Sequence, residues 1–164
     1  MISPGVFKGR FIRFDFGRSL AEVLDLTAEN TPAGRPGGYS GGLNPFNVTS
    51  LPYARGEFPG GVTRNVDIDT GSARGLVLPA DMAATLPLAG PLEPAEDLRL
   101  IGITRKATEA RIAGVVTLGG IAFDSPEATF GEGMKTPHVG MVLLRSTRIV
   151  LDPEGRRTWL LPAA

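Results

Sequence analysis

Apolar residues occur in short runs along this chain, and glycine or proline interrupts most of them. Short runs rich in Val, Ile and Leu that end at turn residues are typical of β-strands. One stretch, residues 80–86, instead has the composition of a short helix, which Pro87 ends. The pattern predicts an all-β domain with one or two short helices. The expected strands are 11–14, 20–26, 49–58, 62–68, 76–78, 98–104, 109–117, 121–123, 148–151 and 158–161.

Two hairpins and a linker organise this pattern. Residues 49–58 and 62–68 flank Pro59-Gly60-Gly61, which predicts a turn. Residues 98–117 predict a second hairpin, with a polar tip at Arg105, Lys106, Ala107 and Thr108. Glycine and proline crowd residues 31–42, which have little to bury, so we interpret 27–47 as a linker. A phosphate-binding loop is a poor alternative there, because no lysine and no helix follow the glycines.

Composition narrows the function classes. The chain has 164 residues, 42% of them hydrophobic and 21% charged, with a formal net charge of zero. This is the balance of a globular protein, and no basic stripe indicates nucleic acid as a partner. No apolar run has the length of a membrane span. The compartment stays open: cytoplasmic, or exported to a periplasm if a signal precedes residue 1.

Two residue types that often carry chemistry are scarce. The chain has no cysteine, which excludes disulfides, thiolate metal sites and cysteine nucleophiles. His138 is the only histidine, which excludes a histidine metal cluster within the chain. We interpret His138 as structural, and we expect neither a metal nor a cofactor.

The run Val66-Asp67-Ile68-Asp69-Thr70-Gly71-Ser72 is the clearest chemical signal. Val66 and Ile68 are strand residues, so Asp69 is expected at the end of a buried strand. Gly71 permits a tight turn whose N–H can hold the Asp69 carboxylate, and Ser72 is expected to stabilise the turn by a hydrogen bond. Two such turns face to face would bring two carboxylates together, and these would share one proton. Asp67 is interpreted as a solvated edge residue.

This motif resembles the aspartic proteases of the retropepsin and pepsin families. Their lobes carry an apolar strand into Asp-Thr-Gly-Ser or Asp-Thr-Gly-Ala, and Val66 to Pro79 fits that pattern. A later element with a hydrophobic pair, a glycine and a short helix resembles residues 138–152, with His138 in place of the first hydrophobic residue. The resemblance implies a protease lobe over 48–164 and a flap hairpin over 98–117. It also implies catalysis by Asp69, loop support from Thr70, Gly71 and Ser72, and a second structural loop at Val139 and Gly140.

Residues 2–15 echo residues 139–152 without a gap. Apolar residues coincide at several positions, and both copies end in aspartate, at Asp15 and Asp152. Under the resemblance, residues 1–26 are the tail of a preceding lobe, and that lobe has its own Asp-Thr-Gly. The alternative is a single-lobe protein that forms a homodimer, with residues 1–26 as an N-terminal arm.

The resemblance predicts an aspartic endopeptidase half-site. Water would be activated between two aspartates, of which Asp69 is one. A dimer mate or a missing N-terminal lobe would supply the other, and the substrate would be a peptide or protein. The rival prediction is a non-catalytic lobe that serves dimerisation or peptide binding.

Overall fold

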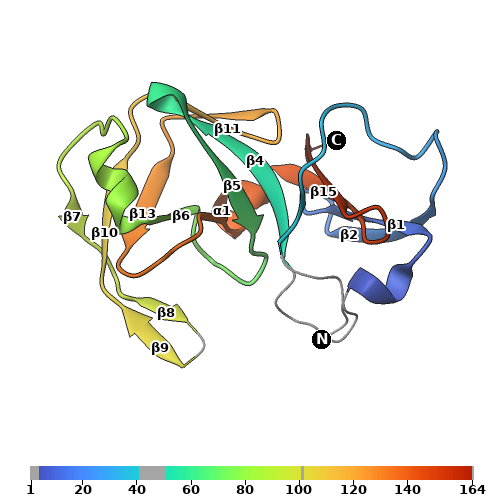
Figure 1. The fold of residues 1–164 in the computed structure, drawn as a ribbon, viewed down its shortest axis with the longest axis horizontal. Coiled ribbons are helices and arrows are strands. Elements are labelled where there is room, and N and C mark those ends of the chain that lie inside the picture. The colour runs from blue at the N-terminus through green and yellow to red at the C-terminus, as the bar shows by residue number, and fades with distance from the viewer. Residues whose placement is uncertain (1–3, 41–50, 101, 164) are drawn as a thin grey trace.

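The computed structural model describes residues 4–40, 51–100 and 102–163, and these form a mostly β structure (Figure 1). The predicted all-β class is confirmed, with a single short α-helix among the described residues. The strands are β1 (Arg10–Asp15), β2 (Leu20–Asp25), β3 (Gly38–Tyr39), β4 (Pro52–Phe58), β5 (Val62–Ile68), β6 (Leu76–Pro79), β7 (Glu93–Pro94), β8 (Leu98–Leu100), β9 (Ile103–Arg105), β10 (Ala107–Arg111), β11 (Val115–Leu118), β12 (Ile121–Asp124), β13 (Glu127–Gly131), β14 (His138–Val139), β15 (Thr147–Asp152) and β16 (Arg157–Pro162). The helical segments are α1 (Met141–Leu144) and the 3₁₀ turns η1 (Pro4–Phe7), η2 (Pro59–Gly61) and η3 (Ala80–Ala84).

The larger sheet has the strand order β12-β11-β4-β5-β14-β6-β13-β10-β7, and β3 pairs with β4. Its β4–β5 hairpin turns where the sequence predicted, because Gly60 and Gly61 take positive φ angles of 78° and 76°. Along β4, Ala54 and Phe58 are buried while Arg55 and Glu57 point outward, the alternation that one covered face requires.

The β14 strand gives this sheet its distinctive centre. It lies between β5 and β6, parallel to β5 and antiparallel to β6. The main hydrophobic core lies against these strands and includes Val66, Ile68, Leu76 and Val139. The β5–β6 segment and the distant strand β14 are therefore hydrogen-bonded together where β5 ends.

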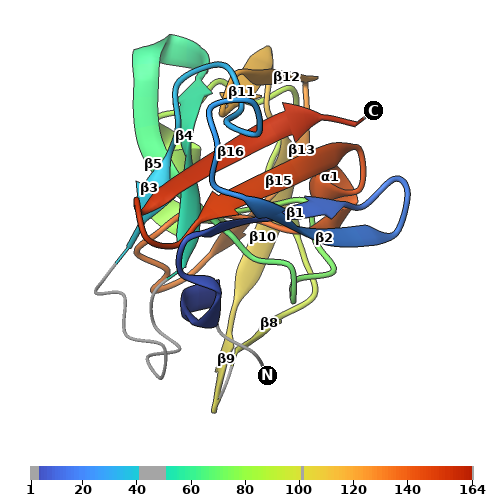
Figure 2. The same ribbon diagram turned by 90° about the vertical axis from the view of Figure 1, so that its right-hand side faces the viewer.

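The smaller sheet joins the two ends of the described chain. Its order is β16-β15-β1-β2, with β1 antiparallel to β15, and Figure 2 shows these strands in the foreground. Within the predicted linker, Tyr39 is only 6% exposed, and Gly37 bridges to Thr158 of β16. The composition of the segment did not indicate this packing, which depends on β4 and β16. Residues 41–50 of the predicted linker lie outside the described residues.

The predicted hairpin over 98–117 is wrong. The structure has a shorter hairpin, β8–β9, in which Gly102, directly before β9, has a φ of +74°. The next strand, β10, pairs with β13 and β7, whereas β11 pairs with β12 and β4. Ala107, predicted at the tip, is buried, and Thr108 pairs with Phe130 inside the sheet. The helix expected over 80–86 is the 3₁₀ turn η3, over Ala80–Ala84.

Candidate active site

Asp69 lies directly after β5, at the start of the loop that leads to β6. The residues before it are fully covered: Val66 is 0% and Ile68 is 4% exposed, whereas Asp69 itself is half-buried. The Asp69 N–H donates to the carbonyl oxygen of Val139, 2.9 Å away. The buried strand and this backbone bond fix where the Asp69 carboxylate emerges.

The turn after Asp69 holds the carboxylate from within. The Gly71 N–H donates to Asp69 Oδ1 at 3.0 Å, the hydrogen bond expected from the sequence. The Ser72 N–H donates to the Asp69 carbonyl oxygen at 3.2 Å, and Ser72 Oγ accepts from the Arg74 N–H at 3.3 Å. Thr70 is exposed at the apex of the turn. An amide donor limits the rotation of the carboxylate that accepts from it.

The Val139-Gly140 segment braces this loop from the side. Val139 is fully buried in the core, and the Gly140 N–H donates to the Gly75 carbonyl oxygen at 2.8 Å. A Cβ at position 140 would lie 2.5 Å from the Arg74 carbonyl oxygen and 2.8 Å from that of Ser72. Both neighbours are backbone atoms, so only glycine fits there without displacing the loop.

Helix α1 continues the same bracing. The Met141 N–H donates to the Ser72 carbonyl oxygen at 2.8 Å, and the Val142 N–H donates to that of Arg74 at 3.1 Å. Three successive amides, from Gly140 to Val142, thus donate to the carbonyls of Gly75, Ser72 and Arg74. These bonds fix the second half of the loop between β5 and β6 to Gly140 and α1.

Arg74 is a site residue that sequence reasoning missed. Its guanidinium donates to the Glu96 carbonyl oxygen at 2.9 Å and to Thr129 Oγ1 at 3.4 Å. It therefore ties the Asp69 loop to β13 and to the segment that precedes β8. A lone arginine after a turn carries no sequence signal of this role, because both partners are distant in the chain.

Asp67 was predicted to be a solvated edge residue, and this is wrong. It is only 6% exposed, because β5 has β4 on one side and β14 on the other. Its direct neighbours in the sheet are Tyr53 and His138. Burial raises the pKa of the Asp67 carboxyl, His138 lowers it, and the nearby Asp69 raises it. The position of Asp69 therefore bears on the ionisation of its neighbour Asp67.

The predicted flap-tip residues are spread over two elements rather than gathered at one tip. Arg105 ends β9, and Ala107 and Thr108 belong to β10. Lys106, between them, forms an exposed ion pair with Asp97 at 3.0 Å. Among the described residues, the strands β8 and β9 form a hairpin that lies apart from the ten-stranded sheet (Figure 1).

Among residues 4–40, 51–100 and 102–163, no group of three or more His, Asp or Glu side chains is placed to hold a metal ion. No helix in that part of the chain is long and apolar enough to cross a membrane.

No protein-family model and no curated protein sequence matches the chain. The structure is similar to that of the EIAV protease complexed with an inhibitor, at 15% identity and a TM-score of 0.48, over 61% of this chain and 90% of that one. It is also similar to a retropepsin-like aspartic protease from Rickettsia conorii, at 17% identity and a TM-score of 0.45, over 64% of this chain and 92% of that one. Neither alignment says which residues of this chain react.

Proposed function

We propose that this chain carries one half of the active site of an aspartic endopeptidase, with Asp69 as its catalytic carboxylate. The observation that carries the proposal is the hydrogen bond from the Gly71 N–H to Asp69 Oδ1, in a loop braced by Gly140 and α1. Groups that act as acid or base need a fixed position, and this carboxylate has one. Thr70, Gly71 and Ser72 support the loop, and Val139 and Gly140 form its second structural element.

The reaction needs a second carboxylate facing Asp69. The two share one proton because both cannot ionise at close range. The ionised carboxylate takes a proton from water, and the water oxygen bonds to the peptide carbonyl carbon. The other carboxyl donates its proton to the carbonyl oxygen, which gives a tetrahedral diol. The C–N bond then breaks as the nitrogen receives a proton and a hydroxyl proton returns to the carboxylates.

The other aspartates considered are poor candidates for the second carboxylate. Asp67 is on β5, two residues before Asp69, and is buried. Asp15 and Asp152 are also buried, and each accepts a hydrogen bond from a backbone N–H of its own turn. The second carboxylate must therefore come from another lobe or from a dimer mate. The isolated chain should be a poor protease.

The test is the variant Asp69→Asn, in any preparation that cleaves peptide. An amide cannot accept the proton from water, so we expect a loss of activity of at least about a thousandfold. Asp81→Asn, at an exposed position in η3, is the matched control and should leave cleavage unchanged. Retained turnover by folded Asp69→Asn would end the catalytic assignment.

A non-catalytic lobe remains the second candidate, since the chain has a single Asp-Thr-Gly motif and Thr70, next to Asp69, is exposed. The two functions differ in one experiment. Peptide binding without cleavage, from acidic to neutral pH and in every oligomeric form, would favour a binding module. A strictly monomeric chain that cleaves peptide would contradict the half-site proposal.

A further inference from the structure

The two ends of the chain fold into the same unit. Shifting the numbering by 137 residues (4 to 141, 10 to 147, 20 to 157) superimposes η1 on α1, β1 on β15 and β2 on β16, with identical lengths. The hairpins also share their register, since Arg10 faces Asp25 in one and Thr147 faces Pro162 in the other. The weak echo in the sequence is therefore a structural repeat, and it extends beyond the aligned residues to Asp25 and Pro162.

The turns of the two hairpins agree in detail. Asp15 Oδ1 accepts from the Arg18 N–H at 3.1 Å, and Asp152 Oδ1 accepts from the Gly155 N–H at 2.8 Å. One residue later, Ser19 has a φ of 51° and Arg156 a φ of 54°. Non-glycine residues are uncommon in this left-handed region, so its recurrence at matching positions supports two copies of one element.

The copies are related by a local two-fold axis. In the antiparallel pairing of β1 with β15, Arg13 faces Val150, and these two residues occupy the same position of the repeat. The sheet order β16-β15-β1-β2 is symmetric about that pair. A two-fold rotation perpendicular to the sheet therefore exchanges the copies and keeps each face of the sheet on its own side.

Only one half of the repeat is fully covered. Leu160 of β16 is 3% exposed and belongs to the main core, but its equivalent Val23 on β2 is 51% exposed. Thr158 is buried and donates to the Gly38 carbonyl oxygen, whereas its equivalent, Ala21, is exposed. The body of the domain covers β15 and β16, and no described residue does the same for β2.

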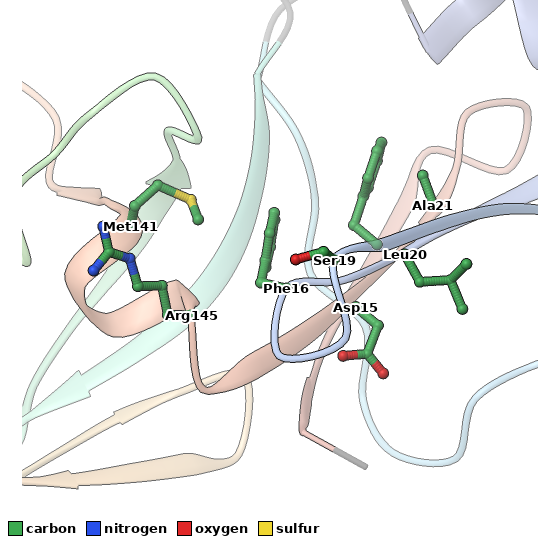
Figure 3. A pocket seen from close by; sticks show the side chains of 8 residues that line it. Asp15, Phe16, Ser19, Leu20, Ala21, Met141 and Arg145 are labelled. Carbon is green, nitrogen blue, oxygen red and sulfur yellow. The ribbon is translucent and has the colours of Figure 1, made fainter.

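The uncovered half carries several exposed apolar side chains and adjoins a cavity. Among the described residues, the large exposed apolar side chains include Val6, Leu20, Val23 and Leu26, all within one short segment. A cavity of about 400 Å³ opens between the β1–β2 turn and α1 (Figure 3). It is lined by Phe14, Phe16, Leu20, Ala21, Met141 and Arg145, with Asp15 and Ser19.

We infer that a second lobe packs on β1 and β2 as residues 52–139 pack on β15 and β16. The partner is a lobe joined ahead of residue 4 in the same polypeptide, with η1, β1 and β2 as its terminal element. A second copy of this chain does not fit in this way, because its body already covers its own β15 and β16. The edge of β15 that a mate's β15 would need is also taken by β1.

This inference rests on the proposed function only for its catalytic consequence, namely that the second lobe supplies the carboxylate that acts with Asp69. The first measurement is the mass of the native polypeptide that contains these residues, by mass spectrometry after purification with an antibody against the chain. We expect 17.3 kDa plus roughly the mass of a second lobe. A native mass of 17.3 kDa would overturn the inference.

The second measurement is the melting temperature of Val23→Glu in the native-length polypeptide and in residues 1–164. We expect a drop of several degrees in the former and almost none in the latter, where Val23 is exposed. Val115→Glu is the matched control, since Val115 is 49% exposed and its strand, β11, belongs to the ten-stranded sheet and not to the repeat. Equal effects of the two substitutions in the native-length protein would contradict the second lobe. If Val23→Glu alone destabilises the native-length protein, and that protein never cleaves peptide, the second lobe is supported and the protease function is contradicted.

Discussion

The Asp69 loop and the β8–β9 hairpin are held by the rest of the molecule in different ways. Backbone hydrogen bonds from Val139, Gly140 and α1 reach the Asp69 loop from outside, and Arg74 ties it to β13. In contrast, β8 and β9 pair only with each other, as a sheet of two strands. The hairpin is anchored at its base, where Leu98 is 5% exposed among Val77 and Ala107.

The difference separates a rigid floor from an arm that can open. Opening the Asp69 loop would break several backbone hydrogen bonds and expose the core around Val139. Of the two large apolar side chains described in the hairpin, only Leu98 would become exposed on opening, because Ile103 is already 42% exposed. Elements with few buried contacts open locally at low free energy, as a substrate lid requires. Three substitutions test this contrast.

Gly140→Ala should have the largest effect. The new Cβ would meet backbone oxygen atoms of Arg74 and Ser72, which cannot move without displacing the Asp69 loop. We expect the free energy of unfolding to fall by about 3 kcal/mol, at the upper end of overpacking effects. This change in the free energy of unfolding is measured by denaturant unfolding of the chain.

Gly90→Ala is the matched control for that substitution. Gly90 is exposed, and a Cβ there would meet nothing within 4 Å. It should leave the free energy of unfolding within about 0.5 kcal/mol of the original. Equal stability of the two variants would show that β14 and α1 do not hold the loop as tightly as the geometry indicates.

Leu98→Ala should affect the hairpin more than the floor. Removing a buried leucine costs about 2 kcal/mol or more, and here the lost contacts lie at the base of β8–β9. Amide hydrogen exchange should accelerate in 98–105 and stay unchanged at Asp69 and Gly140. Ile103→Ala, in the same hairpin but exposed, should change neither. Faster exchange at Asp69 in Leu98→Ala would mean that the hairpin and the floor open as one unit.

The same contrast explains how far the sequence could predict the structure. The strand, turn and returning strand around Asp69 are local: Val66 and Ile68 favour a strand, and Gly71 can close the turn. In contrast, the residue at which the β8–β9 hairpin ends is determined by residues distant in the chain. Residues 105–108 look like a polar tip, but Ala107 and Thr108 pair with β13, a strand about twenty residues later.

Burial of polar side chains was equally hard to predict. An aspartate between two apolar residues has the pattern of a half-exposed strand, so Asp67 resembled a solvated residue. Its burial depends on β14 entering the sheet beside β5, which brings His138 next to it. Tyr39 is a similar case. A tyrosine among glycines does not indicate that its segment forms a strand, β3, which pairs with β4. The resemblance did indicate the positions of Val139 and Gly140, although not the hydrogen bonds that they make.

Asp67→Asn should have the smallest effect, and one that depends on pH. Burial raises the pKa of Asp67 in the folded protein above the ordinary aspartate value of about 3.9. The stability associated with its protonated form is fully present below that value and is lost as the pH rises through the folded pKa. Asparagine has nearly the same shape as a protonated aspartate, and it stays uncharged at every pH. The variant should therefore gain stability relative to the original chain as the pH rises from about 3 toward neutral.

The measurement is the difference in the free energy of unfolding between Asp67→Asn and the original chain at several pH values. Asp81→Asn, at an exposed carboxylate, should give a difference that is nearly flat with pH. His138 opposes the shift by favouring the charged form of Asp67, which is why we expect a smaller change than for the two substitutions above. A difference that shrinks as the pH rises would mean that the attraction of His138 outweighs burial. The carboxylate beside Asp69 would then be charged in the pH range where the proposed dyad has to share a single proton.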